Sequence, residues 1–243
     1  MPLGNSLDCA IVKNRRVLLT KARSWLTMTI SAEPPVTTDE KMILSGISWQ
    51  TYEHLLSDFA GRPSVRLAYD KGTLEIMVVS YGHERLKKII GDLVVRIAFE
   101  FDIDYEGAGS TTFKRESLGA GFEGDESFYF RHLELVRRQS QLDLEQDPPL
   151  DLVIEIDITS PSLSKFPIFA TLGVPEVWRF HENRLLIYRL EGGTYSESQA
   201  SRFLPGVTAD EATRLIEMRE KMAPNAWQRK VSEYAQDIQS GGK

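Results

Sequence analysis

The chain has 243 residues, of which 42% are hydrophobic, and this is enough to bury a substantial core in one domain. Its single cysteine, Cys9, excludes a disulfide framework and a cysteine-based zinc site, and it indicates a reducing, cytoplasmic setting. The formal charge of −6 argues against tight binding to nucleic acid over the whole surface, although it leaves room for a basic groove on an acidic body.

Residues 1–27 differ from the rest of the chain in composition. They hold five basic residues against one acidic residue, and their apolar run Val17–Leu19 is too short for a signal peptide. We therefore expect a disordered leader or a mis-assigned N-terminal extension, with Met28 as the true start. The remainder divides into a main domain over residues 28–205 and a C-terminal helical segment over 206–243, and no apolar run is long enough to span a membrane.

Residues 28–101 alternate between strand and helix signals. Ser48 is typical of a helix N-cap, and Asp70-Lys-Gly72 is typical of a hairpin turn between two apolar runs. Apolar residues from Leu86 to Phe101 recur at helical spacing. The expected elements are an extended lead-in over 29–47, a short helix over 48–56, strands over 64–69 and 74–79, and a long helix over 82–101.

The second half reads as strands, a short helix and two terminal helices. The glycine-rich segment 118–124 is interpreted as a loop, because no Gly-Lys-Ser/Thr follows that would make it a phosphate-binding motif. This order predicts a mixed α/β domain whose sheet is sandwiched between helices. The expected strands are 103–105, 111–114, 125–130, 150–158, 175–180, 184–190 and 195–203, and the expected helices are a surface helix within 131–149 and helices over 165–172, 208–222 and 225–238.

The strand at residues 150–158 is the most informative segment of the sequence. Its alternation places Glu155 and Asp157 on one face and isoleucines on the other. The apolar character of the run indicates a central strand, where an ionised carboxylate needs a cation, a proton or hydrogen bonds. The alternative is an exposed edge strand with a polar outer face. We favour the central strand and hence a metal site.

A third carboxylate and the oxygen ligands indicate which metal ion this site would bind. Asp125 begins the strand expected at 125–130, so it could reach the same place as Glu155 and Asp157; the alternative is a simple turn residue after Gly124. Oxygen ligands favour Mg²⁺ or Mn²⁺ over zinc. None of the four histidines stands in a zinc-binding pattern, and His83 is interpreted as a residue at the start of the long helix with no chemical role.

Lys165 is the second informative residue. It falls in the first turn of an expected helix capped by Ser164, where the helix dipole disfavours a cation by roughly 0.3–1 kcal/mol. An acidic pocket nearby would offset that penalty; the alternative is an ordinary solvated lysine. An ammonium group beside a metal could orient the attacking water and stabilise the charge that develops on a phosphate.

These residues carry a resemblance to a known family. The order Asp125, Glu155-Ile-Asp157, Lys165 resembles the PD-(D/E)xK nuclease superfamily, and more closely the bacterial putative restriction endonuclease family. The matching pieces lie between about Ser45 and Leu204, outside residues 1–27. They are Gly124-Asp-Glu-Ser-Phe-Tyr129, the segment Asp151–Ser160, Lys165-Phe-Pro-Ile-Phe169 and Gly173-Val-Pro-Glu-Val-Trp-Arg179.

The resemblance implies a restriction-endonuclease-like fold with Asp125 and Glu155 as metal ligands and a lysine beside them. It adds Glu84 of the long helix as a further candidate; the alternative is an ordinary partner of the helix dipole. The chain departs from the superfamily pattern at Asp157, which stands where a lysine is usual, so that Lys165 has to reach the site from the following helix. The resemblance also implies a homodimer that acts on DNA.

The leading hypothesis is therefore a Mg²⁺- or Mn²⁺-dependent endonuclease that hydrolyses DNA phosphodiester bonds. In it, Asp157 is a third ligand or orients the other two, and Lys165 positions the attacking water. Two alternatives stay open. One is a binding module that keeps the fold without cleavage, as the acidic body and Asp157 allow. The other is a metal-dependent hydrolase of a smaller phosphoester.

Overall fold

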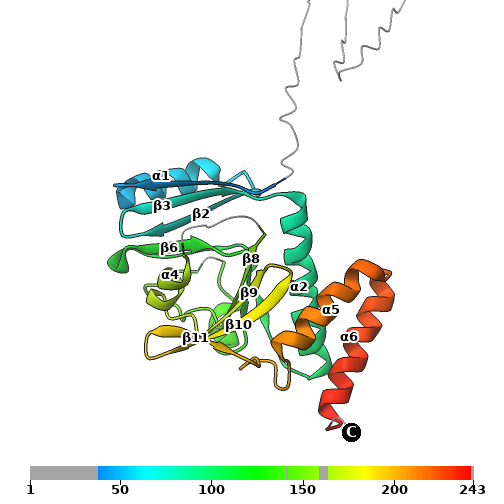
Figure 1. Ribbon diagram of the computed structural model, residues 1–243. Helices are drawn as coiled ribbons and strands as arrows, with labels where there is room; N and C mark the ends of the chain where they lie inside the picture. The colour runs from blue at the N-terminus through cyan, green and yellow to red at the C-terminus, as the bar shows by residue number, and fades with distance from the viewer. Residues whose placement is uncertain (1–37, 141, 159–163, 242–243) are drawn as a thin grey trace, which may run out of the picture. The chain divides into compact units, whose positions relative to one another are not determined.

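The computed structural model describes residues 38–140, 142–158 and 164–241. The expectations about residues 1–27 and a start at Met28 lie outside the described residues. The described chain folds into two sheets with helices against them (Figure 1). The predicted class, a restriction-endonuclease-like mixed α/β fold with C-terminal helices, is confirmed, and the structure adds that the strands divide between two sheets rather than one.

The first sheet is antiparallel and has the strand order β1-β3-β2-β6-β5. Its hairpin turn is the one predicted: Lys71 and Gly72 have φ angles of 44° and 94°. Positive φ at both central residues is what a two-residue turn between twisted strands requires. The strands are β1 (Glu40–Ser45), β2 (Val65–Asp70), β3 (Thr73–Val78), β5 (Thr112–Arg115) and β6 (Ala120–Glu123).

Strand β6 corrects the interpretation of residues 118–124 as a loop. Gly121 pairs with Tyr69 of β2 on one side and with Lys114 of β5 on the other, so this glycine-rich segment is an internal strand. A Cβ atom at position 121 would lie 2.6 Å from the hydroxyl of buried Tyr52. The glycine therefore reflects close packing by a helix residue, which the local sequence does not reveal.

The second sheet is mixed and has the order β11-β10-β9-β8-β7-β4. Strands β8 and β9 are parallel, and the other pairs are antiparallel. All six residues of β8 are buried, so the expected central strand is confirmed. The strands are β4 (Glu106–Gly107), β7 (Glu126–Tyr129), β8 (Leu152–Asp157), β9 (Glu176–His181), β10 (Arg184–Glu191) and β11 (Thr194–Ser198).

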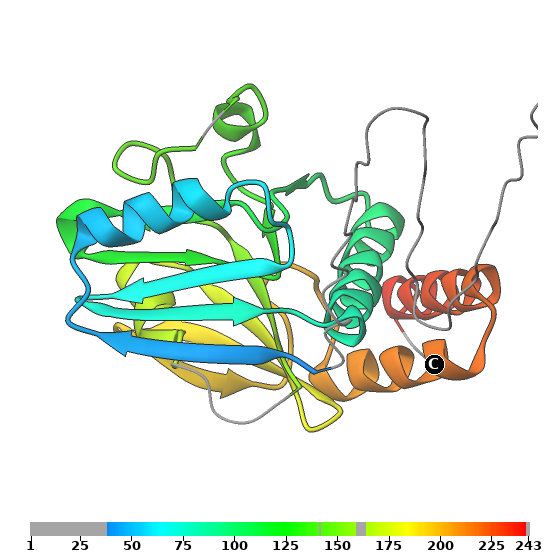
Figure 2. The ribbon, with the colours of Figure 1, turned by 90° about the horizontal axis from the view of Figure 1, so that it is seen from above.

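The helices cover the sheets in layers (Figures 1 and 2). Helix α1 packs on the five-stranded sheet, α4 lies between the two sheets, and α2, α5 and α6 pack on the far face of the six-stranded sheet. None of the described helices has the length and apolar character needed to cross a bilayer. The helices are α1 (Trp49–Phe59), α2 (Tyr81–Glu100), α3 (Leu133–Val136), α4 (Phe166–Thr171), α5 (Ala209–Lys221) and α6 (Pro224–Gln239), with a 3₁₀ turn η1 (Glu116–Leu118).

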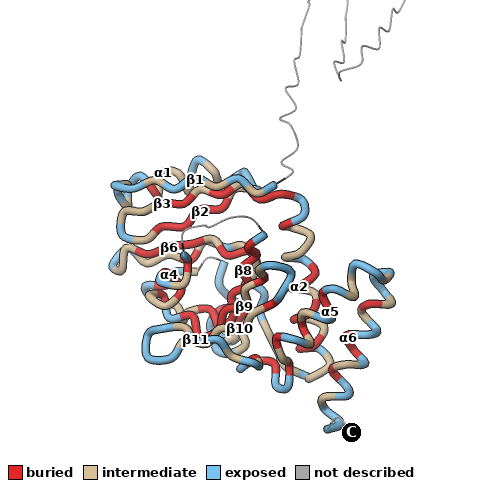
Figure 3. The backbone as a smooth tube through the Cα atoms, viewed as in Figure 1, coloured by how far each residue is buried: buried red, intermediate tan, exposed pale blue. Residues whose placement is uncertain are grey.

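Buried residues gather on the strands and on the helix faces that meet them (Figure 3). One apolar cluster joins α2, α5 and α6 to strands β8, β9 and β10, so the C-terminal helices share a core with the main domain; the boundary at residue 205 stays a prediction. A second cluster joins α4 to the facing sides of both sheets. The chain crosses from β6 of one sheet to β7 of the other at Gly124 and Asp125.

Candidate active site

Strand β8 presents Glu155 to the space between the two sheets. Leu152, Ile154 and Ile156 pack into the cluster around α2, whereas Val153 packs into the cluster around α4. Because successive side chains alternate, Glu155 shares the α4 side with Val153. The predicted alternation is thus confirmed, and it places an acidic side chain at a depth where only 9% of the residue is exposed.

Lys165 reaches Glu155 from the beginning of α4. The expected Ser164 cap is wrong: Lys165 itself is the N-cap residue, without a side-chain capping bond, so its long side chain is free to turn inward. Its Nζ donates a charge-assisted hydrogen bond to Glu155 Oε1 and lies 3.9 Å from Glu75 Oε1. Burial alone would lower the pKa of Lys165, but Glu155, Asp125 and Glu75 raise it above its ordinary value. The lysine is therefore charged.

Glu75 is a member of this site that sequence reasoning missed. It lies on β3 and is only 1% exposed. Leu74 and Ile76 pack toward α1, so Glu75 faces the other way, toward the six-stranded sheet. The signal was a carboxylate on the apolar hairpin strand. It could not be used because the sequence does not say that both faces of the hairpin are covered.

Asp125 lies beside Glu155 because it sits where the chain crosses between sheets. Its Oδ2 accepts a hydrogen bond of 2.7 Å from the backbone N–H of Ile156, the residue after Glu155. Its Oδ1 lies 2.7 Å from His83 Nε2, an ion-pair distance although the two atoms do not meet hydrogen-bond geometry. Burial would raise the pKa of Asp125, but His83, Lys165 and the Ile156 N–H lower it below its ordinary value.

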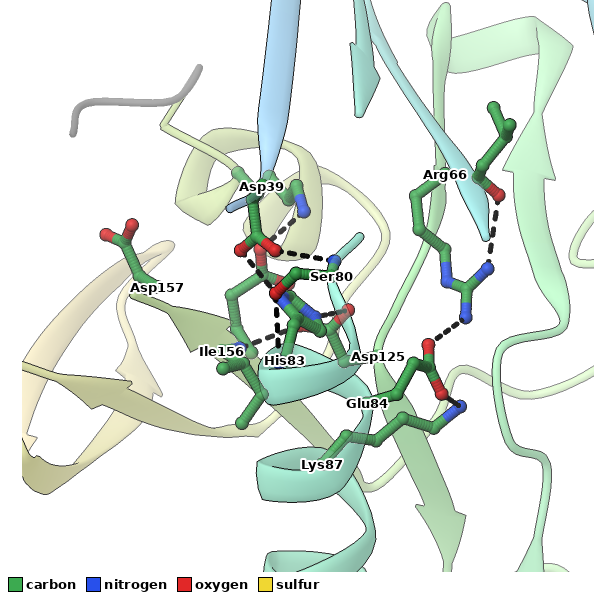
Figure 4. A network of polar contacts seen from close by, with 12 residues as sticks. Asp39, Arg66, Ser80, His83, Glu84, Lys87, Asp125, Ile156 and Asp157 are labelled. Carbon is green, nitrogen blue, oxygen red and sulfur yellow. Dashed lines mark hydrogen bonds and ion pairs between the residues drawn. The ribbon is translucent and has the colours of Figure 1, made fainter. Parts of the chain in front are cut away.

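His83 lies at the start of the long helix, as predicted, and the structure adds that it makes ion pairs inside the site. It is fully buried in the first turn of α2 and bridges Asp125 and Asp39 (Figure 4). Its Nδ1 lies 2.9 Å from Asp39 Oδ2, and Asp39 Oδ1 accepts a 2.8 Å hydrogen bond from the backbone N–H of Ser80. Burial alone would lower the pKa of His83, but the two aspartates raise it to about 9.

Asp39 was also missed, because it precedes β1 in a segment expected only to be extended. Burial would raise its pKa, yet the contacts with His83 and Ser80 lower the pKa of Asp39 to about 2. Together these side chains form a set that we call the inner cluster. Its members are Asp39, Glu75, His83, Asp125, Glu155 and Lys165.

The inner cluster carries more negative than positive charge, with four carboxylates against Lys165 and His83. Glu155 shows the imbalance: burial raises its pKa to about 7, with Asp125 and Glu75 adding to the shift and Lys165 opposing it. Its Oε2 is buried and, among the described residues, has no hydrogen-bond partner. A buried carboxylate oxygen without a partner calls for a proton or a cation.

A divalent cation fits this donor set. Mg²⁺ is held in proteins by one or two carboxylates and keeps several water ligands. Glu155 Oε2, which is buried without a hydrogen bond, would supply one of these oxygens. Asp125 would supply the other by exchanging the contact of its Oδ1 with His83 for the cation, while its Oδ2 keeps the hydrogen bond from Ile156. Within the described ranges, no three His, Cys, Asp or Glu side chains are grouped as a complete metal cage, so the remaining ligands would be water or substrate oxygens.

Two predicted site residues lie apart from the inner cluster. Glu84 accepts hydrogen bonds from Arg66 at 2.9 Å and Lys87 at 3.4 Å, and Figure 4 shows this group extending away from Asp125. Asp157 points away from the His83–Asp125 pair in the same view. The structure thus brings Asp125, Glu155 and Lys165 together, and it surrounds Glu84 and Asp157 with other partners.

Asp157 is the centre of a second set of side chains, which we call the outer cluster: Lys41, Asp157, Arg179 and His181. Arg179 Nη2 donates to Asp157 Oδ2 at 2.5 Å, and Lys41 Nζ lies 3.5 Å from Oδ1. The His181 Nδ1 atom lies 3.5 Å from Oδ2. Both carboxylate oxygens of Asp157 are therefore engaged by basic side chains, unlike those of Glu155.

The comparison with protein families shows which family the chain belongs to. No curated protein matches the chain. The model of the Uma2 family, described as putative restriction endonuclease, matches residues 49–219. The match includes every inner-cluster residue except Asp39 and covers well over half of the chain. The chain belongs to the Uma2 family of putative restriction endonucleases.

Proposed function

We propose that this chain is a Mg²⁺- or Mn²⁺-dependent endonuclease that hydrolyses phosphodiester bonds of DNA. Membership of a restriction endonuclease family supports nuclease activity. The observation that carries the proposal is Glu155: a buried carboxylate with one oxygen held by Lys165 and the other without a hydrogen-bond partner in the described chain. That oxygen is available to a cation, in a cluster whose charge favours one.

In this proposal Asp125 and Glu155 hold the cation. When bound, the cation supplies Lewis-acid stabilisation of phosphoryl oxygens and makes water more acidic. The backbone N–H of Ile156 fixes the orientation of Asp125, and His83 fixes its second oxygen. These contacts hold one candidate ligand in place before substrate binds.

Lys165 has two roles in the proposal. Its hydrogen bond to Oε1 of Glu155 orients that carboxylate so that Oε2 faces away from the ammonium group. Its positive charge, kept by the surrounding carboxylates, can stabilise the negative charge that builds up on the phosphate in the transition state. An ammonium group in a buried site acts more strongly there than it would in water.

The assembly and location complete the proposal. Cutting both strands of a duplex needs two sites, so we propose that the chain acts as a homodimer, which light scattering in solution would test. A cytoplasmic location belongs to the same proposal and is supported by the single cysteine, Cys9.

The direct test is cleavage of supercoiled plasmid with Mg²⁺ or Mn²⁺. The wild type is expected to nick or linearise the plasmid, Glu155→Gln is expected to be inactive, and chelation of the metal is expected to stop the reaction. Glu233→Gln is the matched control, because Glu233 is an exposed carboxylate on α6 whose partner is Lys230.

Three outcomes would contradict the proposal. Cleavage by Glu155→Gln at the wild-type rate would remove the inner cluster from the chemistry. Absence of cleavage across several DNA substrates and metals would favour a binding module. Hydrolysis of a small phosphodiester without any action on DNA would favour the smaller-substrate hydrolase.

A further inference from the structure

We propose that the outer cluster is a phosphate-binding subsite, which contacts the DNA backbone next to the phosphate at Glu155. The inference rests on the proposed function and deepens it by assigning a second point of substrate contact. It also gives a role to Asp157, the aspartate that stands where the superfamily pattern has a lysine.

Three members of the outer cluster, Asp157, Arg179 and His181, share a face of the six-stranded sheet with Glu155. In the parallel register of β8 and β9, Glu155 lies beside Arg179 and Asp157 lies beside His181. Asp157 and His181 are the last residues of their strands, so the cluster lies at the carboxyl ends of the parallel pair. In open α/β sheets, ligands bind outside this end of the strands.

The spacing suits neighbouring backbone phosphates. Two residues along a strand advance by roughly 6.6 Å. Phosphates along one strand of duplex DNA advance by about 3.4 Å of helix axis each. A strand of DNA that runs along β8 with one phosphate at Glu155 would therefore place another phosphate, one or two nucleotides away, near Asp157. The ion pair with Asp157 brings the guanidinium of Arg179 to the same point.

The charge of the outer cluster is opposite to that of the inner one. Lys41 and Arg179 carry two positive charges against the single buried carboxylate of Asp157, and His181 lies between Asp157 and the exposed carboxylate of Glu182 at 3.7 Å. One cation would be enough to neutralise Asp157. The excess positive charge is what a site for a phosphate anion requires, and it lies on a protein whose formal charge is −6.

Exposure separates the carboxylate from its cations. The Asp157 side chain is 8% exposed, whereas the side chains of Arg179 and His181 are 30% and 38% exposed. The aspartate and Lys41, whose side chain is 12% exposed, are the buried part of the cluster, and Arg179 and His181 lie nearer the surface where a phosphate can reach them. An arginine held in this way is pre-organised to bind phosphate through two N–H groups.

Both sheets contribute to the cluster. Lys41 comes from β1 of the five-stranded sheet, and its cross-strand neighbour Met77 lies two residues from Glu75 on β3. Arg179 and His181 come from β9 of the six-stranded sheet. The subsite thus lies over the same inter-sheet space that holds the inner cluster, and Asp157 fixes the cations from the two sheets at one point.

The test is the salt dependence of DNA binding. A short fluorescein-labelled duplex is titrated with the full chain in Ca²⁺ at several salt concentrations, and anisotropy gives the Kd. Lys41→Gln and Arg179→Gln are each expected to reduce the slope of log Kd against log salt by about 0.9, and to weaken binding about eightfold at roughly 0.1 M salt. Arg214→Gln is the matched control, because Arg214 forms an ion pair on α5 with Glu211 at 2.7 Å.

Two further variants separate a binding role from a structural one. Arg179→Lys keeps the charge and is expected to retain most of the wild-type slope. The double variant Arg179→Gln/Asp157→Asn removes the ion pair as a neutral unit, so it folds without an unpaired carboxylate. It is still expected to show a smaller slope of log Kd against log salt than the wild type. Circular dichroism and thermal unfolding check that each variant is folded.

The outcomes distinguish this inference from the proposed function. If the wild type binds DNA and all folded variants keep its slope, the subsite is overturned while the nuclease proposal stands. If the wild type does not bind DNA, both fail. If the variants lose slope but the wild type never cleaves, the subsite is supported and the catalytic proposal alone fails.

Discussion

Glu155 and Asp157 stand two residues apart on one face of β8, yet their surroundings are opposite. Glu155 meets one lysine among further carboxylates, and one of its oxygens has no hydrogen-bond partner in the described chain. Asp157 meets three basic side chains, which engage both of its oxygens. The difference shows that a strand's alternation decides which side chains share a face, whereas neighbouring elements decide what each carboxylate can bind.

The two clusters differ in depth as well as in charge. Lys165 is 6% exposed and is held among carboxylates, so its charge is available only to groups inside the site. Arg179 has a side chain that is 30% exposed, so its charge is available to solvent and to a passing anion. This contrast makes the ion pairs of the two clusters unequal in energy, and variants can measure the inequality.

Lys165→Met is expected to have the largest effect. It leaves Glu155 and Glu75 buried without their ammonium partner, which destabilises a fold by about 3–5 kcal/mol. The equivalent change in the outer cluster, Arg179→Met, is expected to cost about 1 kcal/mol or less, because the pair is partly exposed and Lys41 stays. Urea unfolding measures both values.

A second change sharpens that result. Adding Glu155→Gln to Lys165→Met is expected to recover part of the lost stability, because it removes a buried negative charge. Equal losses of stability for Lys165→Met and Arg179→Met would contradict the proposed difference in burial between the clusters.

The same pair of positions separates cleavage from binding. Glu155→Gln is expected to lower the rate of Mg²⁺-dependent cleavage by at least about 100-fold, since it removes the proposed metal ligand, whose contribution we expect to be several kcal/mol. Asp157→Asn is expected to lower it by less than about tenfold, because it disturbs only the orientation of Arg179 and Lys41. Single-turnover cleavage of labelled DNA gives both rates, and a loss at Asp157 as large as that at Glu155 would make Asp157 a ligand after all.

The inner cluster is also expected to respond to pH through His83. Its pKa rises from 6.5 in the unfolded chain to about 9 in the fold, so its stabilisation is complete below pH 6.5 and is lost as the pH rises through 9. The loss amounts to about 3 kcal/mol at most. Urea unfolding between pH 7.5 and 9.5 should show it in the wild type and not in His83→Gln. The same variant controls for Glu155, whose pKa of about 7 lies just below this range.

Asp39 is expected to make stability depend on pH in the opposite direction, with a loss at acid pH. Its pKa falls from 3.8 to about 2, so its contribution is complete above pH 3.8 and is lost as the pH falls toward 2.

Stability that stays constant from pH 7.5 to 9.5 in the wild type would contradict the His83 prediction, because it would show that His83 is not held as a cation between the two aspartates.

The smallest effect is expected at Glu84. Its carboxylate has a side chain that is 38% exposed and is paired with Arg66 and Lys87, so Glu84→Gln should change stability by less than about 1 kcal/mol. Cleavage should change by less than about threefold, since Glu84 makes its contacts outside the inner cluster. A loss of cleavage rate comparable to that of Glu155→Gln would show that Glu84 acts together with the inner cluster.

Much of the fold could be predicted because its signals are local. The Ser48 cap, the Lys71-Gly72 turn and the spacing within α2 each depend on a few consecutive residues. The failure at β6 has a non-local cause, since Gly121 is a strand residue because it pairs with β2 and β5, and Tyr52 leaves no room for a side chain there. Propensity favours a loop there, and tertiary packing overrides it.

The same distinction between local and non-local signals applies to the site residues. Glu155 and Lys165 could be found because a carboxylate on an apolar strand and a cation at a helix start are anomalies visible in sequence. Glu75, His83 and Asp39 could not, because each is an ordinary residue for its local element and becomes unusual only when the two sheets close over it. Asp157 shares its face with Glu155, but its partners come from β1 and β9.

The position of Lys165 has a consequence for how such chains are recognised. The ammonium group lies beside Glu155 although its residue is ten positions further along the chain and belongs to a different element. A search pattern that fixes glutamate and lysine two positions apart would reject this chain at Asp157. A criterion based on where the charge lies in space, with either the strand or the following helix as its source, would retain it.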